Sequence, residues 1–171
     1  MLPPEMKAYL EDFSRMLREH LGISYNTIIT LEVLKEAIKT KFTNFEIIYS
    51  DVEKLVINKD STCIIHLQED KSYDDQLVYI SLFFVHGLLN LTSKIISRKL
   101  EISIGKILND KNSYFVTLAF LIPINLFYQL ISEYNASSKN SIDEVFNSMS
   151  LALNIKKHYI YKRAKDLKYI K

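Results

Sequence analysis

Residues 76–93 contain no charged side chain over 18 positions, and this run constrains the fold more than any other feature of the sequence. On a helix, the apolar residues between positions 77 and 91 lie on nearly every side. A helix that is apolar all round has to be covered by the rest of the chain. We therefore predict a central buried helix over residues 74–97, with Asp74 and Asp75 at the positive end of its dipole.

Two polar residues of this helix, His86 and Asn90, are four positions apart and so share one helix face. The two zinc-binding histidines of an H-E-x-x-H motif have the same spacing, and the glutamate between them is the general base. Here Gly87 stands at the glutamate position and Asn90 at the second histidine. The pattern indicates the frame of a metallopeptidase helix without its chemistry. The alternative interpretation is a buried histidine that is hydrogen-bonded to a carbonyl group or to Asn90.

Helical periodicity also covers most of the remaining chain. Apolar residues at three- and four-residue spacing predict helices over 3–21, over 26–41 with Asn26 as the N-cap, and on both sides of Pro123, over 112–122 and 124–134. Ser141 and Glu144 fit a capping box, and Asn154 suits a left-handed turn before a last helix. The final two helices therefore form a C-terminal helical hairpin of helix-turn-helix proportions.

The period changes to that of strands between residues 45 and 67. Segments 45–49, 55–57 and 63–67 are β-branched or aromatic, and polar turn residues separate them. A further short strand is expected at 102–104, within the connector 100–110. The expected fold class is α+β, mainly helical, with a small three-stranded antiparallel sheet packed on the central buried helix. We expect domain boundaries at 1–134 and 135–171, with the polar segment 135–140 between them and the hairpin packed on the same core.

The charge is unevenly distributed along the chain. The net charge is +2, but residues 153–171 hold seven Lys or Arg and one Asp, a formal charge of +6, so the other residues carry −4. This asymmetry predicts a C-terminal surface that faces an anion, nucleic acid or a protein partner. The alternative is a lysine-rich terminal helix that only confers solubility. The candidate binding residues are Lys156, Lys157, Lys162, Arg163, Lys165 and Lys168.

The uncharged runs 76–93 and 112–132 raise the question of a membrane. The second is long enough to span about 30 Å of hydrocarbon. Pro123 in its middle and the polar residues in both runs favour buried core helices instead, so we expect no membrane insertion. A single cysteine, Cys63, excludes an internal disulfide, and the first residues lack a basic signal-peptide region. We expect a cytoplasmic protein.

The order of these parts resembles the ImmA/IrrE family of metallopeptidase-like proteins. The zinc helix of that family reads like R-F-T-I-A-H-E-L-G-H-x-L-L, and its glutamate helix like E-A-N-x-F-A-x-x-L-L-M-P. Residues 111–123 keep the phenylalanine and the proline of the second motif. The resemblance runs from about residue 26 to 167. The positions that fit the zinc helix and the family's C-terminal motif are Leu82, Phe84, His86, Leu88, Leu91, Ile155, Ile160, Arg163, Ala164 and Leu167.

The resemblance implies a degenerate member that lacks the zinc-site residues. Lys111 occupies the position of the glutamate ligand, with Asp110 next to it. The degenerate ligand positions are then His86, Asn90 and Asp110. Because an amide is a poor zinc ligand and Lys111 adds positive charge, we expect no metal, no cofactor and no catalytic residue.

Three functions are compatible with these features. The first is a non-catalytic pseudo-peptidase that regulates by binding a protein partner, such as a helix-turn-helix repressor of a phage or mobile element. The second is nucleic-acid binding through the basic C-terminal hairpin. The third is a residual metal-dependent peptidase. The first is the preferred hypothesis, and it predicts that the protein is not an enzyme.

Overall fold

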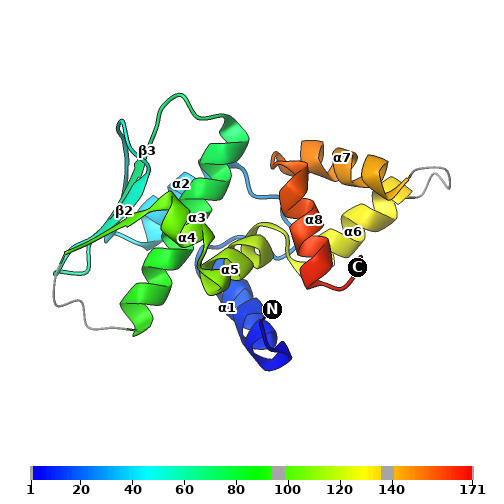
Figure 1. Ribbon diagram of the computed structural model, residues 1–171, viewed down its shortest axis with the longest axis horizontal. Coiled ribbons are helices and arrows are strands. Elements are labelled where there is room, and N and C mark those ends of the chain that lie inside the picture. Colours follow the sequence, from blue (N-terminus) through cyan, green and yellow to red (C-terminus); the bar gives the residue numbers. More distant parts are fainter. Residues whose placement is uncertain (1, 94–98, 136–140, 171) are drawn as a thin grey trace.

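The computed structural model describes residues 2–93, 99–135 and 141–170, which form eight helices and four strands (Figure 1). The fold is α+β and mainly helical, as expected. The helices are α1 (Pro4–His20), α2 (Leu31–Lys41), α3 (Tyr73–Ser93), α4 (Ile104–Leu108), α5 (Lys111–Leu121), α6 (Ile124–Asn135), α7 (Ile142–Leu153) and α8 (Lys157–Asp166). The strands are β1 (Phe45–Tyr49), β2 (Lys54–Ile57), β3 (Cys63–Leu67) and β4 (Leu100–Ser103).

The sheet lies at one end of the molecule, and α6, α7 and α8 lie at the other, with α1 and α5 between them (Figure 1). Helix α3 packs across β2 and β3 on one side and against α5 on the other. Helix α2 contacts both β1 and α3. Helix α3 is therefore the central element, because the sheet, α2 and α5 all contact it.

The prediction of a central buried helix is confirmed for α3. Leu77, Phe83 and Val85 are completely buried, and the residues after Gly87 are more accessible. The last residues predicted for this helix, 94–97, lie outside the described residues. Within the part of the chain that the structure describes, no single helix is long and apolar enough to cross a membrane. Helices α5 and α6 reach that length and composition only as a pair, with a bend of 53° between them.

The sheet differs from the expected three-stranded antiparallel meander. It has four strands in the order β1-β3-β2-β4, and β1 pairs with β3 in parallel, while β2 is antiparallel to both β3 and β4. Strand β3 is central, with Cys63, Ile65 and Leu67 all fully buried. The alternation of apolar residues reveals a strand but not the direction or identity of its neighbours, so the sequence pattern could not supply this order.

Two segments begin elsewhere than the sequence predicts. Helix α2 starts at Leu31, with Thr30 rather than Asn26 as its N-cap. The carbonyl groups of Ser24 and Thr27 accept hydrogen bonds from the buried Arg18, so this stretch wraps the guanidinium instead of forming helix. The short strand expected at 102–104 begins earlier, as β4 (Leu100–Ser103), and Ile104 is already the first residue of α4. A five-residue helix such as α4 depends on tertiary packing and leaves no periodic signal.

The C-terminal hairpin has the predicted caps. The Ser141 side chain accepts from the Glu144 main-chain N–H while the Glu144 side chain accepts from that of Ser141, and Asn154 adopts a left-handed conformation with φ of 51°. The hairpin joins the common core through Phe146, Met149 and Ile160, all buried. Residues 136–140, where we expected the domain boundary, lie outside the described residues.

Candidate functional site

His86 on α3 faces the beginning of α5 and is 8% exposed. Its Nδ1 atom lies 2.7 Å from Ser113 Oγ and 3.1 Å from Asp110 Oδ2. Ser113 Oγ in turn donates to Asp110 Oδ2 at 3.0 Å. One ring nitrogen of His86 is thus shared by a hydroxyl and a carboxylate that also bind each other.

Asp110 is held by a structural role of its own. It is the N-cap of α5, and its Oδ1 atom accepts from the main-chain N–H groups of Asn112 at 3.0 Å and Ser113 at 3.4 Å. Cap residues satisfy donors that a helix leaves without partners at its start. One oxygen of Asp110 therefore caps α5, and the other contacts the His86 side chain. The residue that the resemblance placed next to the family's ligand position is thus the N-cap of α5.

Asn90 is hydrogen-bonded to the main chain of His86. Its Nδ2 donates to the main-chain carbonyl of His86 at 2.9 Å, one turn back along α3. The alternative interpretation of this helix expected a buried histidine that is hydrogen-bonded to a carbonyl group or to Asn90. His86 is buried and accepts a hydrogen bond from Asn90 through its main-chain carbonyl group, and its ring contacts Ser113 and Asp110.

Gly87 lies against the sheet, where there is no room for a side chain. A Cβ atom there would lie 2.9 Å from Cε1 and 3.0 Å from Cζ of Phe45, and 3.5 Å from Cys63 Sγ. The Phe45 ring is fixed by an edge-to-face contact with Phe84. The position at which a metallopeptidase helix has its general base is therefore filled by a core aromatic ring.

Ser113, His86 and Asp110 are the residues of a nucleophilic triad, but their geometry differs from one. In a triad, the histidine binds the nucleophile with one ring nitrogen and the acid with the other. Here Nδ1 contacts both, and Ser113 is completely buried, so a substrate has no access to its hydroxyl. Sequence reasoning missed Ser113. Its position in the sequence could have indicated it, because Ser113 is three residues after the N-cap Asp110 and the first turn of α5 brings the two side chains together.

No group of three His, Cys, Asp or Glu side chains among the described residues is arranged to hold a metal ion. Of the three degenerate ligand positions, the structure brings His86 and Asp110 together, and Asn90 Nδ2 donates to the main-chain carbonyl of His86. Lys111 follows Asp110 in the chain and is exposed.

The six basic candidates of the C-terminal region fall into three groups. Lys156 binds Asp75 at 2.6 Å, a hydrogen bond that raises the pKa of Lys156, and Lys157 binds Asp143 at 2.9 Å. Arg163 is completely buried, so its place among the surface-binding residues was wrong. A guanidinium that serves the core cannot contact phosphate groups. Lys162, Lys165 and Lys168 are exposed.

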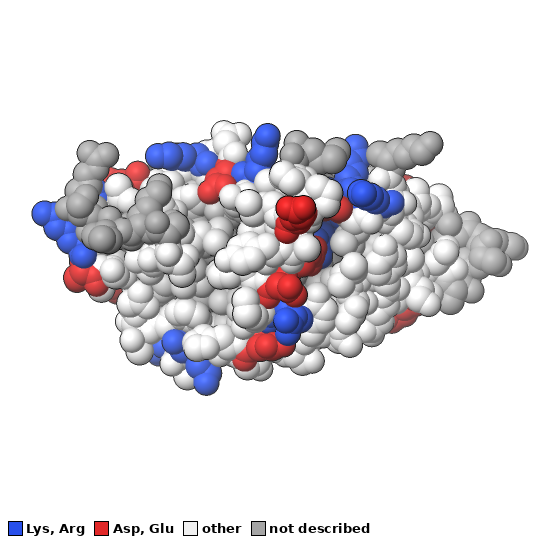
Figure 2. All heavy atoms as spheres, turned by 90° about the horizontal axis from the view of Figure 1, so that it is seen from below, with Lys and Arg blue, Asp and Glu red and all other residues white. Residues whose placement is uncertain are grey.

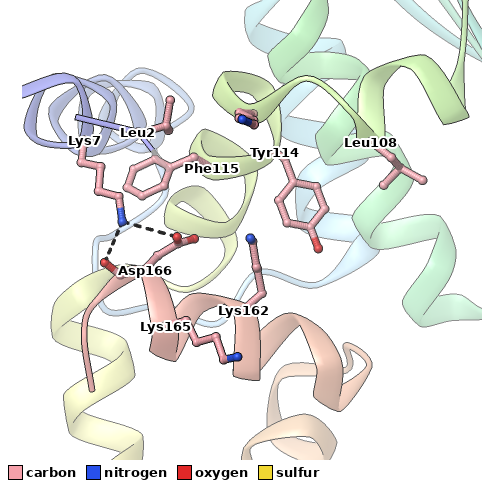
Figure 3. Close-up of a pocket in the computed structure, with 9 residues that line it drawn as sticks. Leu2, Lys7, Leu108, Tyr114, Phe115, Lys162, Lys165 and Asp166 are labelled. Carbon is pink, nitrogen blue, oxygen red and sulfur yellow. Dashed lines mark hydrogen bonds and ion pairs between the residues drawn. The ribbon is translucent and has the colours of Figure 1, made fainter. Parts of the chain in front are cut away.

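Lys162 and Lys165 lie at the edge of a cavity of about 640 Å³ between α1, α5 and α8 (Figure 3). Lys7 and Lys111 lie on the same cavity. Sequence reasoning did not group these four lysines, because they are on three helices far apart in the chain. Comparisons with protein-family models, with curated proteins and with solved structures found no match. The resemblance to the ImmA/IrrE family therefore rests on the sequence pattern alone.

Proposed function

We propose that this protein is a non-catalytic regulator of the ImmA/IrrE-like pseudo-peptidase type, which acts by binding a DNA-binding protein such as a helix-turn-helix repressor. One observation carries the proposal. The Phe45 ring occupies the space beside His86 in which a general base would have to stand, and it packs against Gly87. Water activation at a metal needs an open coordination position and a base next to it. A centre filled in this way favours binding over hydrolysis.

The polar groups that remain around α3 have structural duties. His86 Nδ1 is bound by Ser113 and Asp110, and Asp110 also caps α5. Lys111 stands at the position where the resemblance places the glutamate ligand, so that ligand is missing. These contacts are consistent with a metallopeptidase-like fold in which structural side chains have replaced the zinc ligands.

The exposed side of α1 has the features of a protein-binding surface. Met6, Tyr9 and Met16 are 41%, 62% and 50% exposed, and the half-buried Phe13 lies between them. Their spacing of three and four residues places all four on one helix face. A row of exposed apolar side chains on a helix is the anchor pattern for docking into a groove of another protein.

Acidic residues border this row. Glu5, Asp12 and Glu19 recur every seven residues, and Arg15 forms ion pairs with Asp12 at 3.6 Å and Glu19 at 2.9 Å. Helix α1 lies toward the viewer in Figure 2, which shows a narrow band of charges across a largely uncharged face. An acidic border complements the basic surface with which a repressor binds DNA phosphates. We therefore expect the partner's DNA-binding surface to cover α1.

The test is a comparison of two variants in affinity capture from the native host, followed by mass spectrometry. Tyr9→Glu combined with Met16→Glu places two charges on the apolar row. Leu151→Glu, at a residue that is 80% exposed on α7, is the matched control. We expect the unchanged protein and the control to retain a DNA-binding protein that the double variant loses. The purified partner should release its operator when the regulator is added in equal amount, and the partner should stay uncleaved.

Several outcomes would overturn the proposal. One is recovery of no DNA-binding protein, and another is equal recovery with the double variant. A third is cleavage of the captured partner, abolished by chelator, together with about one equivalent of a transition metal in protein purified without chelator. That third result would establish the residual metal-dependent peptidase instead.

A further inference from the structure

The cavity between α1, α5 and α8 has an apolar wall. Phe115 is buried at its back, the ring of Tyr114 lies beside it, and Leu2 and Leu108 complete this wall. Figure 3 shows the Tyr114 ring extending from α5 into the space that α8 faces. The volume of about 640 Å³ is within the range of pockets that bind small organic molecules.

Lysine side chains from three helices line the same cavity. Lys162 and Lys165 project from α8, Lys111 comes from the first turn of α5, and Lys7 comes from α1. Among the described residues that line the cavity, only Asp166 has a carboxylate, so these five side chains carry a formal charge of +3. Across the described residues, Lys111, Lys162 and Lys165 have no ion-pair or hydrogen-bond partner, in contrast to Lys156 and Lys157 on the same C-terminal hairpin.

Asp166 is engaged by a neighbour and does not neutralise the other lysines. Lys7 Nζ lies 3.5 Å from Asp166 Oδ1 and donates to the main-chain oxygen of the same residue at 3.2 Å. Lys7 also lies 5.5 Å above the centre of the Phe115 ring. This contact fixes one side of the cavity and leaves the other three ammonium groups available to an anion.

We propose that this cavity binds a nucleoside monophosphate, or a small molecule of the same chemistry, with a planar ring and a terminal phosphate. Lysine ammonium groups are compact, strongly hydrated cations that suit phosphate oxygens. Three of them line the same cavity without carboxylate partners, and a phosphate bound there would offset their positive charge. The half-buried Tyr114 ring supplies an aromatic surface on which a base ring can stack.

This site is independent of the proposed partner surface. Lys7 is on the side of α1 that faces α5 and α8, whereas Met6, Tyr9 and Met16 form the exposed row. Because the bound molecule would contact α1, α5 and α8 together, it would also stabilise the fold against unfolding. Ligand binding can thus be measured without any knowledge of the partner.

The test uses the full chain and isothermal titration with adenosine monophosphate at about 50 mM salt, where exposed charges are least screened. Inorganic phosphate and adenosine are titrated separately. We expect the monophosphate to bind at least about tenfold more tightly than either fragment, which corresponds to about 1.4 kcal/mol. Lys162→Gln combined with Lys165→Gln should weaken binding by about tenfold or more. Lys156→Gln combined with Lys157→Gln removes the same charge from ion-paired positions and should leave the affinity within about twofold.

Thermal unfolding provides a second measurement on the same proteins. The monophosphate should raise the melting temperature of the unchanged protein and of the Lys156/Lys157 variant, and not that of the Lys162/Lys165 variant. The proposal is wrong if no heat of binding is seen up to about 1 mM ligand. A dissociation constant of that size corresponds to a binding free energy of about 4 kcal/mol. It is also wrong if both double variants lose affinity equally. Binding that appears only with oligonucleotides and strengthens with their length would point to nucleic acid along α8 instead.

Discussion

Glu11 on α1 and Arg163 on α8 form a two-pronged ion pair that joins the first helix of the chain to the last. Arg163 Nη2 lies 2.9 Å from Glu11 Oε2, and Arg163 Nε donates to the carbonyl oxygen of Ile122 at 2.9 Å. Arg18 is equally buried and donates to the carbonyl oxygens of Phe120, Ser24 and Thr27. Arg18 and Arg163 thus bind the carbonyl groups of Phe120 and Ile122 at the C-terminal end of α5, where the last carbonyl groups of a helix have no partner within it.

Arg163→Met should therefore destabilise the protein strongly, although the new side chain is apolar and of similar length. It leaves the Glu11 carboxylate without its partner and the Ile122 carbonyl without its donor, at a cost of about 3–5 kcal/mol. The free energy of unfolding from urea titrations measures the loss. Arg15→Met removes an exposed arginine with two ion pairs on the same α1 helix and should cost less than about 1 kcal/mol. Similar losses for the two variants would refute the assigned role of Arg163.

Gly87→Ala tests the closed centre of α3. The added methyl group would lie 2.9 Å from the Phe45 ring, so the ring or the strand must move, at about 1–3 kcal/mol. Gly105→Ala is the control, because nothing lies within 4 Å of the corresponding Cβ position, and alanine is the better helix residue by up to about 1 kcal/mol. We expect urea unfolding to show opposite effects of the two changes. A neutral Gly87→Ala would mean that the space beside His86 is not filled.

Asp110 should contribute to stability in two separable ways. Asp110→Ala removes both the cap of α5 and the contact with His86 and should cost about 1–3 kcal/mol. Asp110→Asn keeps a good N-cap and removes only the negative charge, so its cost should be clearly smaller. Chemical denaturation of the two variants measures the difference. Equal costs would show that Asp110 stabilises the protein through its negative charge beside His86 and not through the cap.

Cys63 should resist alkylation while the protein is folded. Its thiol is completely buried on β3, and burial raises the pKa of Cys63 to about 12. Because the thiolate is the reactive form, iodoacetamide at about pH 8 should label the folded protein at least about a hundredfold more slowly than the urea-unfolded chain. Mass spectrometry over time measures both rates, and comparable rates would place the thiol at the surface.

The raised pKa of Cys63 also has a consequence for stability. As the pH rises, the thiol ionises in the unfolded chain before it ionises in the folded protein, so the unfolded state binds fewer protons. The stabilising contribution of the neutral buried thiol is therefore fully present below an ordinary thiol pKa of about 8.5 and falls between there and about pH 12. Urea unfolding at increasing pH should show part of this decline in the unchanged protein and less of it in Cys63→Ala.

The helices were predictable where their sequence signal is local. The apolar run over 76–93 required a central helix, Pro123 divided α5 from α6, and Ser141 with Glu144 marked the start of α7. The start of α2 was not predictable, because the residues before Thr30 are shaped by Arg18 from a different helix. Local propensity fails there because a buried charge needs those carbonyl groups as acceptors.

The sequence by itself determined that α3 is buried and that His86 and Asn90 lie on one face of it, because helical spacing follows from chain geometry alone. It also located the basic C-terminal segment. Only the tertiary structure decided that Ser113 and Asp110 meet His86, that Phe45 fills the space at Gly87, and that Lys7, Lys111, Lys162 and Lys165 share a cavity. Contacts between elements distant in the chain arise from packing, and a periodic pattern within one element contains no information about its neighbours.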